Sequence, residues 1–242
     1  MLISRTTRNT DTCVVSYAKG KRKATDKAKY SDALPRLAES IERNTSYDYF
    51  LWNADETEPP HPLAFKHLTH DQRPYFFKLT MIQLMREQGY KRIIWLDSVM
   101  TLEKELTPDL FTYGIMAFHN LGHPLKNYIS DQCVSYFGCE KDLPNMEQTW
   151  GGAFALNFNS PTALWVFDDL LKAADAGCFN NGTSIREGFI AHRHDQSVLS
   201  VLLHWYEYKL LPYGTIVTHP HYLQPFEYGT DFYIAHRQIP KP

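Results

Sequence analysis

The sequence predicts an α/β fold in which a mixed sheet is flanked by helices on both faces within a single domain. Residues 93–96 form a short apolar run, which is typical of a strand buried on both faces of a sheet. Residues 75–89 precede this run with an amphipathic helical pattern that closes at Gly89. The first ~100 residues alternate strand-like and helix-like segments in this way, as α/β folds do.

The composition is that of a folded globular protein. The chain has 242 residues, of which 43% are hydrophobic and 21% are charged, and this length suits one large α/β domain. The formal net charge of -2 disfavours a broad surface for nucleic acids or membranes. No segment approaches the ~20 apolar residues of a membrane span, and the polar N-terminus does not resemble a signal peptide. We therefore expect a cytoplasmic protein with no nucleic-acid partner and no membrane span.

Cysteines and aromatic residues leave two questions open. The four cysteines show no spacing typical of metal ligands, which favours reduced side chains, with a disulfide as the alternative. The aromatic share of 14% fits either a large core or a site whose rings stack on a base or a sugar.

The first part of the chain contains two strand patterns and two helix patterns before residues 93–96. The strands are expected at 13–17 and 49–52, and the helices at 26–43 and 75–89. Pro35 would break or kink the first helix, and Pro74 would open the second. Residues 58–62 read as a proline-rich loop.

The second part of the chain looks like an elaborated half on the same sheet. Thr107-Pro108 and Ser160-Pro161 each have the pattern of a helix cap followed by the first helical residue. Strands are expected at 114–119, 152–158 and 210–217, and helices at 161–176 and 195–208. We expect residues from about 1 to 103 to form a nucleotide-binding half, and residues from about 104 to 242 to form a substrate half.

Asp97 is the first candidate for a functional side chain. It follows directly after the apolar run, and open α/β sheets bind ligands outside the carboxyl ends of their strands. Asp97 could be a structural carboxylate in a strand-to-loop turn, or it could hold a divalent cation against a diphosphate. Its position alone does not decide between the two roles.

Two further segments carry polar residues or glycine beside apolar elements. Gly151 and Gly152 precede an apolar strand, where they would form a tight turn or allow a ligand to approach the backbone closely. Asp195 opens an apolar helix, either as its N-cap or as a carboxylate held at the mouth of a site. We expect its neighbours His192 and His194 to be solvated loop residues rather than ligands.

The remaining signals are weak. His219-Pro-His221 could bind a metal, but no third ligand lies nearby in the sequence. The basic run Lys19–Lys23 suits a solvated loop or the screening of a diphosphate. Neither the G-x-G-x-x-G nor the Walker A spacing is present.

Taken in order, these elements resemble the nucleotide-sugar glycosyltransferases of the GT-A fold, of viral and bacterial type. The resemblance rests on Phe77-Lys78, the Ile-Ile-Trp-Leu-Asp run that ends at Asp97, Trp150-Gly-Gly152 and His194-Asp-Gln-Ser197, and it spans roughly residues 12–220. It implies a Rossmann-type mixed sheet, a nucleotide-sugar donor and a carbohydrate or glycoconjugate acceptor.

The resemblance also implies roles for individual residues. Ser16, Tyr17 and Ala18 would lie against the nucleotide base, and Lys78 would lie near the donor phosphates. Asp97 with Ser98 would open an Asp-x-Asp motif that holds Mn²⁺ or Mg²⁺ on the diphosphate. The sugar and the acceptor would be bordered by Trp150, Gly151, Gly152, His194 and Gln196. Asp195 would be the general base or would position the sugar.

One departure from the family pattern concerns the metal. Val99 stands where the second aspartate of Asp-x-Asp is expected. His219 could complete a metal site with Asp97, metal dependence could be weak, or catalysis could be lost. The sequence therefore favours a glycosyltransferase and leaves two alternatives. One is a non-catalytic nucleotide- or carbohydrate-binding protein, and the other is a metal-dependent hydrolase built on His192, His194, His219 and His221.

Overall fold

A six-stranded mixed sheet forms the centre of the molecule. The computed structural model describes residues 1–7, 10–21, 27–57, 59, 74–111, 113–212, 217–218 and 234–236. The strand order is β1-β3-β2-β4-β9-β6. The strands are β1 (Leu2–Arg5), β3 (Asp48–Asn53), β2 (Thr12–Ala18), β4 (Arg92–Leu96), β9 (Ala153–Asn157) and β6 (Ile115–Met116).

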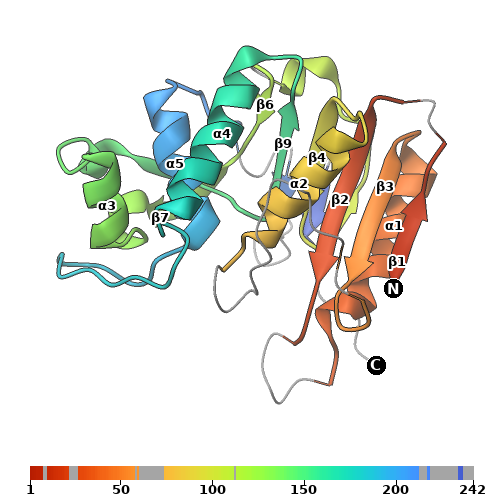
Figure 1. Cartoon of the computed structure of the whole chain (residues 1–242), viewed down its shortest axis with the longest axis horizontal. Helices are drawn as coiled ribbons and strands as arrows, with labels where there is room; N and C mark the ends of the chain where they lie inside the picture. Colours follow the sequence, from red (N-terminus) through yellow and green to blue (C-terminus); the bar gives the residue numbers. More distant parts are fainter. Residues whose placement is uncertain are drawn as a thin grey trace.

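The neighbouring strands β3, β2 and β4 run in the same direction. β2 pairs in parallel with β3 on one side and with β4 on the other, with Val15 opposite Phe50 and Trp95. β1 pairs antiparallel with β3, and β9 pairs antiparallel with both β4 and β6. Figure 1 shows β2 and β3 side by side with their arrows pointing the same way. The carboxyl ends of β2 and β4 therefore meet at one edge of the sheet.

Successive side chains along the strands point to opposite faces of the sheet and pack into two separate hydrophobic cores. Ile93 and Trp95 of β4 face the core built with α2 (Phe77–Glu87), α4 (Pro161–Asp175) and α5 (His194–Trp205). Ile94 and Leu96 face the core built with α1 (Leu34–Asn44). Both faces of β4 are thus buried, which explains why its sequence is apolar throughout and confirms the expected helices on both faces. Figure 1 shows α2 and α4 on one side of the sheet and α1 on the other.

Smaller elements complete the described part of the fold. β5 (Met100–Leu102) pairs with β11 (Ile234–His236), which pairs with β10 (Val217–Thr218). A two-stranded ribbon of β7 (His119–Pro124) and β8 (Glu147–Thr149) lies near α3 (Asp131–Phe137). The short 3₁₀ helices are Tyr30–Ala33, Pro108–Leu110, Leu125–Asn127 and Leu143–Asn145. Within the described ranges, no helix is long and apolar enough to cross a membrane. The four cysteines are all buried and unbridged.

The helix starts differ from the sequence expectation at two prolines. The helix expected at 26–43 begins at Leu34, so Pro35 lies in its first turn, where its missing N–H leaves no hydrogen bond unmade, and does not kink it. The helix expected from residue 75 begins at Phe77, because Tyr75 has a left-handed φ of 60° that interrupts helical geometry. It ends at Glu87, and Gly89 follows with a φ of 96°, as predicted for a glycine stop.

The strands expected at 13–17, 49–52 and 152–158 are present with bounds shifted by one or two residues. The strand expected at 114–119 is instead the short β6 followed by β7. Of the strand expected at 210–217, Leu211 bridges Phe118 and Val217 belongs to β10, whereas 213–216 lie outside the described residues. β1, α3 and β8 were not expected, since they are too short to show a clear hydrophobic period.

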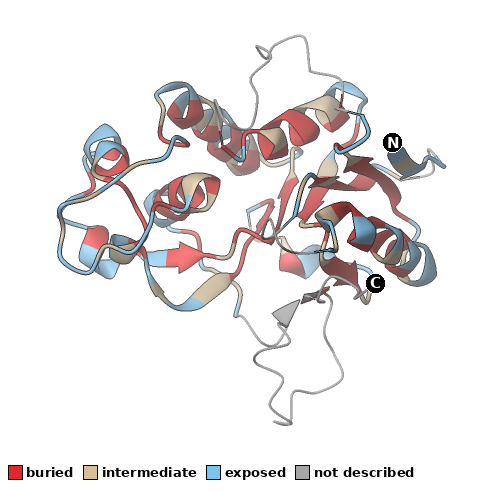
Figure 2. Ribbon diagram, turned by 90° about the horizontal axis from the view of Figure 1, so that it is seen from below, coloured by how far each residue is buried: buried red, intermediate tan, exposed pale blue. Residues whose placement is uncertain are grey.

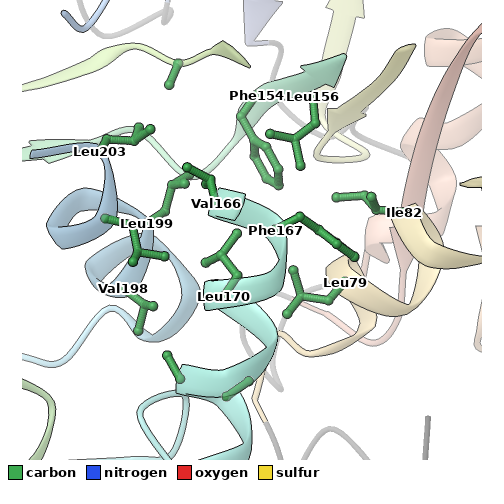
Figure 3. Packing of buried hydrophobic residues seen from close by; sticks show 14 of the residues in the cluster. Leu79, Ile82, Phe154, Leu156, Val166, Phe167, Leu170, Val198, Leu199 and Leu203 are labelled. Carbon is green, nitrogen blue, oxygen red and sulfur yellow. The ribbon is translucent and has the colours of Figure 1, made fainter. Parts of the chain in front are cut away.

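Helix α4 anchors the larger core. Figure 3 shows it between α5 and α2, with Phe154 and Leu156 of β9 nearby. Phe167 projects from α4 toward Leu79 and Ile82 of α2 and is fully buried. Figure 2 shows the general pattern, in which buried residues line the strands and the inner sides of the helices.

We predict that Phe167→Ala lowers the free energy of unfolding by about 3–5 kcal/mol, because it removes a ring from a closely packed core and leaves a cavity. Trp165→Ala on the same helix is the matched control, since Trp165 is 55% exposed. Urea denaturation of both variants measures the difference. Equal losses in the two variants would mean that α4 does not organise the core.

Candidate functional site

A pocket of about 270 Å³ lies at the carboxyl ends of β2 and β4. β2 contributes Tyr17, Ala18 and the following Lys19, and the residues after β4 contribute Asp97, Ser98 and Val99. Tyr30, Tyr75 and Phe77 complete its lining. The pocket therefore lies where the sequence places a ligand, since parallel neighbouring strands bring their carboxyl ends together.

Aromatic rings form much of this pocket's wall. Tyr17 stacks on Phe77, with ring centroids 4.3 Å apart and planes 17° apart. Phe77 in turn lies 5.7 Å from the ring of Trp95. The stack ties β2, α2 and β4 together and presents flat apolar surfaces beside charged side chains. Such a surface suits a nucleobase or the apolar face of a sugar ring.

Asp97 is held in place by its own strand and by the neighbouring strand. Its N–H donates to the carbonyl of Gly152 at 2.8 Å, and its Oδ1 accepts from the indole of Trp95 at 2.8 Å. Its side chain is 44% exposed, and the residue lines the pocket. Desolvation raises the pKa of this carboxyl, and the charge of Lys78 and the Trp95 hydrogen bond only partly oppose the rise.

Lys78 lies between two carboxylates. Its ammonium is 2.8 Å from Oδ2 of Asp195 and 3.9 Å from Oδ1 of Asp97, and it donates to the carbonyl of Gly151 at 2.8 Å. The rings of Tyr75 and Trp95 each lie 5.4 Å from the ammonium. Burial by itself lowers the pKa of Lys78, but the charges of Asp195 and Asp97 outweigh it, so the pKa is raised. Lys78 is therefore a charged and almost fully buried group.

Asp195 lies deeper than the sequence suggested. Helix α5 begins at His194 with Arg193 as its N-cap, so Asp195 is in the first turn and is not the cap. The residue is only 8% exposed and does not line the pocket. The expectation of a carboxylate at the mouth of the site is thus wrong, because Asp195 is turned toward the buried ammonium of Lys78.

Gly151 allows the turn before β9 to pack closely against α5, and Gly152 lies close to the ring of Trp150. A side chain at Gly151 would meet Oε1 of Gln196 at 3.0 Å, and one at Gly152 would meet the Trp150 ring at 2.8 Å. Their carbonyls accept from Lys78 and Asp97, respectively. The glycines therefore bring the backbone against the charged cluster, and Trp150 packs against the smaller core.

Two aromatic residues beside this cluster have unusual backbone conformations. Tyr75 and His194 have φ angles of 60° and 48°, which are rare for bulky side chains. Their rings stack on one another at 5.1 Å. Each such residue costs about 1–3 kcal/mol, and strain of this kind gathers at functional sites. The two residues precede Lys78 and Asp195, so the strained turns position both partners of the buried ion pair.

His192 is a structural residue, which corrects the expectation of a solvated loop histidine. It is 6% exposed, its Nδ1 accepts from the N–H of Ser130, and its Nε2 contacts the carbonyl of Cys178 at 2.8 Å. Burial lowers its pKa to about 4, so the ring is neutral at physiological pH and Nε2 carries the proton. Both nitrogens are engaged by the backbone, which leaves neither for a metal. His194 is half-buried, with Nδ1 2.9 Å from the carbonyl of Phe179.

The described residues contain no cluster of three His, Cys, Asp or Glu side chains that could hold a metal. His219 and His221, the other histidines considered for a metal, lie outside the described residues. The histidine-based hydrolase therefore gains no support from the part of the chain that the structure describes.

Most of the residues expected to bind the donor gather around the pocket, with one exception. Tyr17, Ala18, Asp97 and Ser98 line it. Ser16 is fully buried on the α1 side of the sheet, because it is flanked by residues that face the opposite core. Tyr30, Tyr75, Phe77 and Val99 were not singled out as donor-binding residues, although the aromatic run before Lys78 is visible in the sequence.

Comparisons with known proteins support the fold. No sequence-family model matches the chain, and no curated protein matches it significantly. Among solved structures, 169 chains match. One is the crystal structure of a glycosyltransferase involved in the glycosylation of the major capsid of PBCV-1. The two chains are 13% identical with a TM-score of 0.51, and the match covers 93% of this chain and 92% of that one. This similarity confirms the expected mixed α/β fold, which is consistent with a GT-A-like domain.

We predict that Lys78→Met lowers the free energy of unfolding at pH 7 by about 3–5 kcal/mol, because it leaves the buried carboxylate of Asp195 without its cation. The pKa of Lys78 is higher in the folded state than in the unfolded state. Its charge therefore stabilises the wild-type fold fully when the pH is below the pKa of the unfolded state, and this stabilisation is lost as the pH rises through the pKa of the folded state. The loss caused by the substitution should shrink in acid, where the carboxylates take up protons.

Urea denaturation of wild type and Lys78→Met across the pH range measures this difference. Lys91→Met is the matched control, because Lys91 is exposed. A pH-independent difference between Lys78→Met and wild type would contradict the assignment of Lys78 as the counter-ion.

Proposed function

We propose that the protein is a glycosyltransferase that moves a sugar from a nucleoside-diphosphate donor to an acceptor hydroxyl, with a glycan as the acceptor. The observation that carries this proposal is the cluster of Asp97, Lys78 and Asp195 beside an aromatic pocket at the carboxyl ends of β2 and β4. The similarity in fold to a glycosyltransferase agrees with it but does not identify the donor or the acceptor.

The donor would lie in the pocket with its base toward the aromatic wall. Tyr17 and the backbone of Ala18 border the space that the base would occupy. Lys19 lies at the same edge and would attract the diphosphate. The sugar would then extend toward Asp97 and the Lys78 cluster, where Trp150, Gly151, Gly152, His194 and Gln196 are our candidates for sugar and acceptor contacts.

The net charge of the cluster would repel the diphosphate of a donor. Asp97 and Asp195 carry two negative charges and Lys78 one positive charge, so a diphosphate approaching them meets a net negative charge. A divalent cation would relieve this repulsion, and Mg²⁺ is often held by one or two carboxylates together with substrate phosphates. Asp97 fits such an ion as a single protein ligand, because its carboxylate is exposed to the pocket. When bound, Mn²⁺ or Mg²⁺ would neutralise the charge that develops on the leaving diphosphate.

Transfer requires that the acceptor oxygen bonds to the anomeric carbon while the bond from that carbon to the diphosphate oxygen breaks. The electron pair leaves with the diphosphate, and the acceptor hydroxyl gives its proton to a base. We propose Asp195 for the base in an inverting reaction. In a retaining reaction Asp195, paired with Lys78, would instead orient the hydroxyls of the donor sugar. Either role requires the Tyr75–His194 stack beside it to admit the substrate, since Asp195 is nearly buried in the free protein.

The second candidate is a non-catalytic nucleotide- or carbohydrate-binding protein on the same fold. Val99 favours it, because it lines the pocket at the position where Asp-x-Asp would supply a second carboxylate. Nucleotide binding without turnover on any acceptor would support this alternative.

We predict that nucleoside diphosphates raise the melting temperature of the wild type, because nucleotide at a hundredfold excess over Kd adds about 2.7 kcal/mol to the stability of the folded state. Mn²⁺ should increase this rise in melting temperature. Asp97→Asn should remove the Mn²⁺-dependent part and leave the fold intact, because the raised pKa of Asp97 shows that its charge does not stabilise the folded state. Asp109→Asn on an exposed turn is the control. Thermal-shift assays measure all three proteins, and an Mn²⁺ response that persists in Asp97→Asn would exclude Asp97 as the ligand.

We predict that Asp195→Asn lowers the rate of sugar transfer by about 10²–10⁴-fold and changes nucleotide affinity much less. Asparagine keeps the shape of the side chain, so the fold should persist, with some loss of stability from the broken ion pair. Release of nucleoside diphosphate in the presence of an acceptor measures the rate, with the exposed Asp142→Asn as control. Near-normal turnover in a folded Asp195→Asn protein would assign Asp195 a structural role only.

A further inference from the structure

A second polar region lies on the β7–β8 ribbon, away from the donor pocket. Two hollows of about 380 and 250 Å³ open beside this ribbon. They share His119, Asn145 and Glu147, so they adjoin one another at these residues. The larger hollow is within the range of about 300–1,000 Å³ that is typical of ligand sites. We call this feature the ribbon groove.

An irregularity in the ribbon creates the larger hollow. His119 pairs with Thr149 and Pro124 pairs with Glu147, so five residue steps of β7 face only two steps of β8. The extra residues interrupt the ladder of hydrogen bonds across 120–123 and push β7 outward. Gly122, with a φ of 76°, allows the sharp bend. Bulges of this kind recur next to binding sites, where they redirect side chains.

A buried polar group is left without a partner at this place. Gln148 is 1% exposed and lines the larger hollow. Its Oε1 accepts from Nδ2 of Asn120 at 2.7 Å, but its Nε2 has no hydrogen-bond partner among the described residues. An unpaired buried donor costs about 1–3 kcal/mol. Because Nε2 is itself buried, the amide would turn toward the hollow to donate to a ligand oxygen and so recover that cost.

The remaining polar groups indicate the class of ligand. The imidazole of His119 lies 2.8 Å from the Glu147 carboxylate, where the two hollows meet. Together with Asn120, His123 and Asn145 they offer both donors and acceptors within a small space. Among the described residues, the lining of the larger hollow contains no lysine or arginine, Lys209 lines only the smaller hollow, and Glu147, which both hollows share, would repel an anion. Such a mixture of amide, imidazole and carboxylate suits neutral hydroxyl groups.

We infer that the ribbon groove binds a neutral oligosaccharide, as the site that holds the acceptor glycan of the reaction proposed above. Two adjoining hollows fit a chain of sugars better than a single sugar, with one unit on each side of the His119–Glu147 pair. Gln148 is three residues from Gly151, whose carbonyl contacts Lys78, so the Cα atoms of Gln148 and Gly151 are at most about 11 Å apart. A glycan in the groove could thus present its end to the proposed reaction centre. This inference rests on the proposed function only in calling the glycan an acceptor.

The test is the binding of wild type and two variants to an immobilised array of neutral and sulfated oligosaccharides. Asn145→Trp would fill the point shared by both hollows, and Glu147→Ala would remove an acceptor. Both side chains are exposed, so both variants should fold. Asn159→Trp, in an exposed turn that lines neither hollow, is the matched control. We expect neutral oligosaccharides to bind wild type and Asn159→Trp, and to bind Asn145→Trp and Glu147→Ala about tenfold more weakly or worse.

Three results would overturn the inference: no binding to wild type, a preference for the sulfated probes, or equal binding by Asn145→Trp. The nucleotide-induced rise in melting temperature, measured on the same samples, separates this inference from the proposed function. Glycan binding without sugar transfer from any donor would contradict the transferase and leave the ribbon groove as a carbohydrate site. Sugar transfer that is unaffected by Asn145→Trp would contradict the groove and leave the transferase.

Discussion

The candidate site depends on one buried cation. Lys78 projects from α2 into a space enclosed by β4, β9 and α5, and its ammonium reaches a carbonyl and two carboxylates. A charge in such surroundings is tolerated only when it is paired and hydrogen-bonded, so the positions of Asp97, Asp195 and Gly151 constrain one another. The ion pair therefore fixes how the helix before β4 meets the helix that follows much later in the chain. Any chemistry at this edge of the sheet takes place on that framework.

The surroundings of Lys78 include features that lower the stability of the fold. Asp97 keeps a raised pKa, which means that its charge is disfavoured in the folded state. Tyr75 and His194 hold left-handed conformations beside it. Both features reduce stability and would be unnecessary in a purely structural ion pair. A preorganised site accepts such costs because its groups must stand ready before the substrate arrives.

The molecule places different kinds of polar surface on its two halves. The pocket at β2 and β4 combines aromatic walls with Lys19 and Asp97, which suits a charged ligand that contains a base. The ribbon groove combines amides, imidazoles and Glu147, which suits a neutral ligand rich in hydroxyls. Trp150, Gly151 and Gly152 lie between these regions along the chain, immediately after β8 and before β9. A two-substrate reaction would require this division of surfaces, with its chemistry between them.

The sequence by itself determined the strands β2, β3, β4 and β9 of the sheet, the main helices and the location of the pocket. The apolar run before Asp97 was informative because both faces of this strand are buried. Every residue of such a strand is then apolar, so the strand can be recognised from its sequence. Asp97, Tyr17 and Ala18 could be placed at the pocket because strand ends converge in parallel sheets. The periodic helices α2, α4 and α5 were likewise visible, with bounds that differ from the expected ones by at most three residues.

Tertiary structure alone decided the electrostatics of the site and the shape of the ribbon. The ion pair of Lys78 with Asp195 joins residues 117 positions apart, and no local pattern reports such a contact. His192 looked solvated in sequence because the carbonyl and N–H groups that satisfy it come from Cys178 and Ser130. The bulge of β7 depends on its register with β8, and β8 in turn is hydrogen-bonded to α5 through the Thr149 N–H and Ser200. Local patterns record burial and periodicity, whereas contacts between distant segments exist only once the chain has folded.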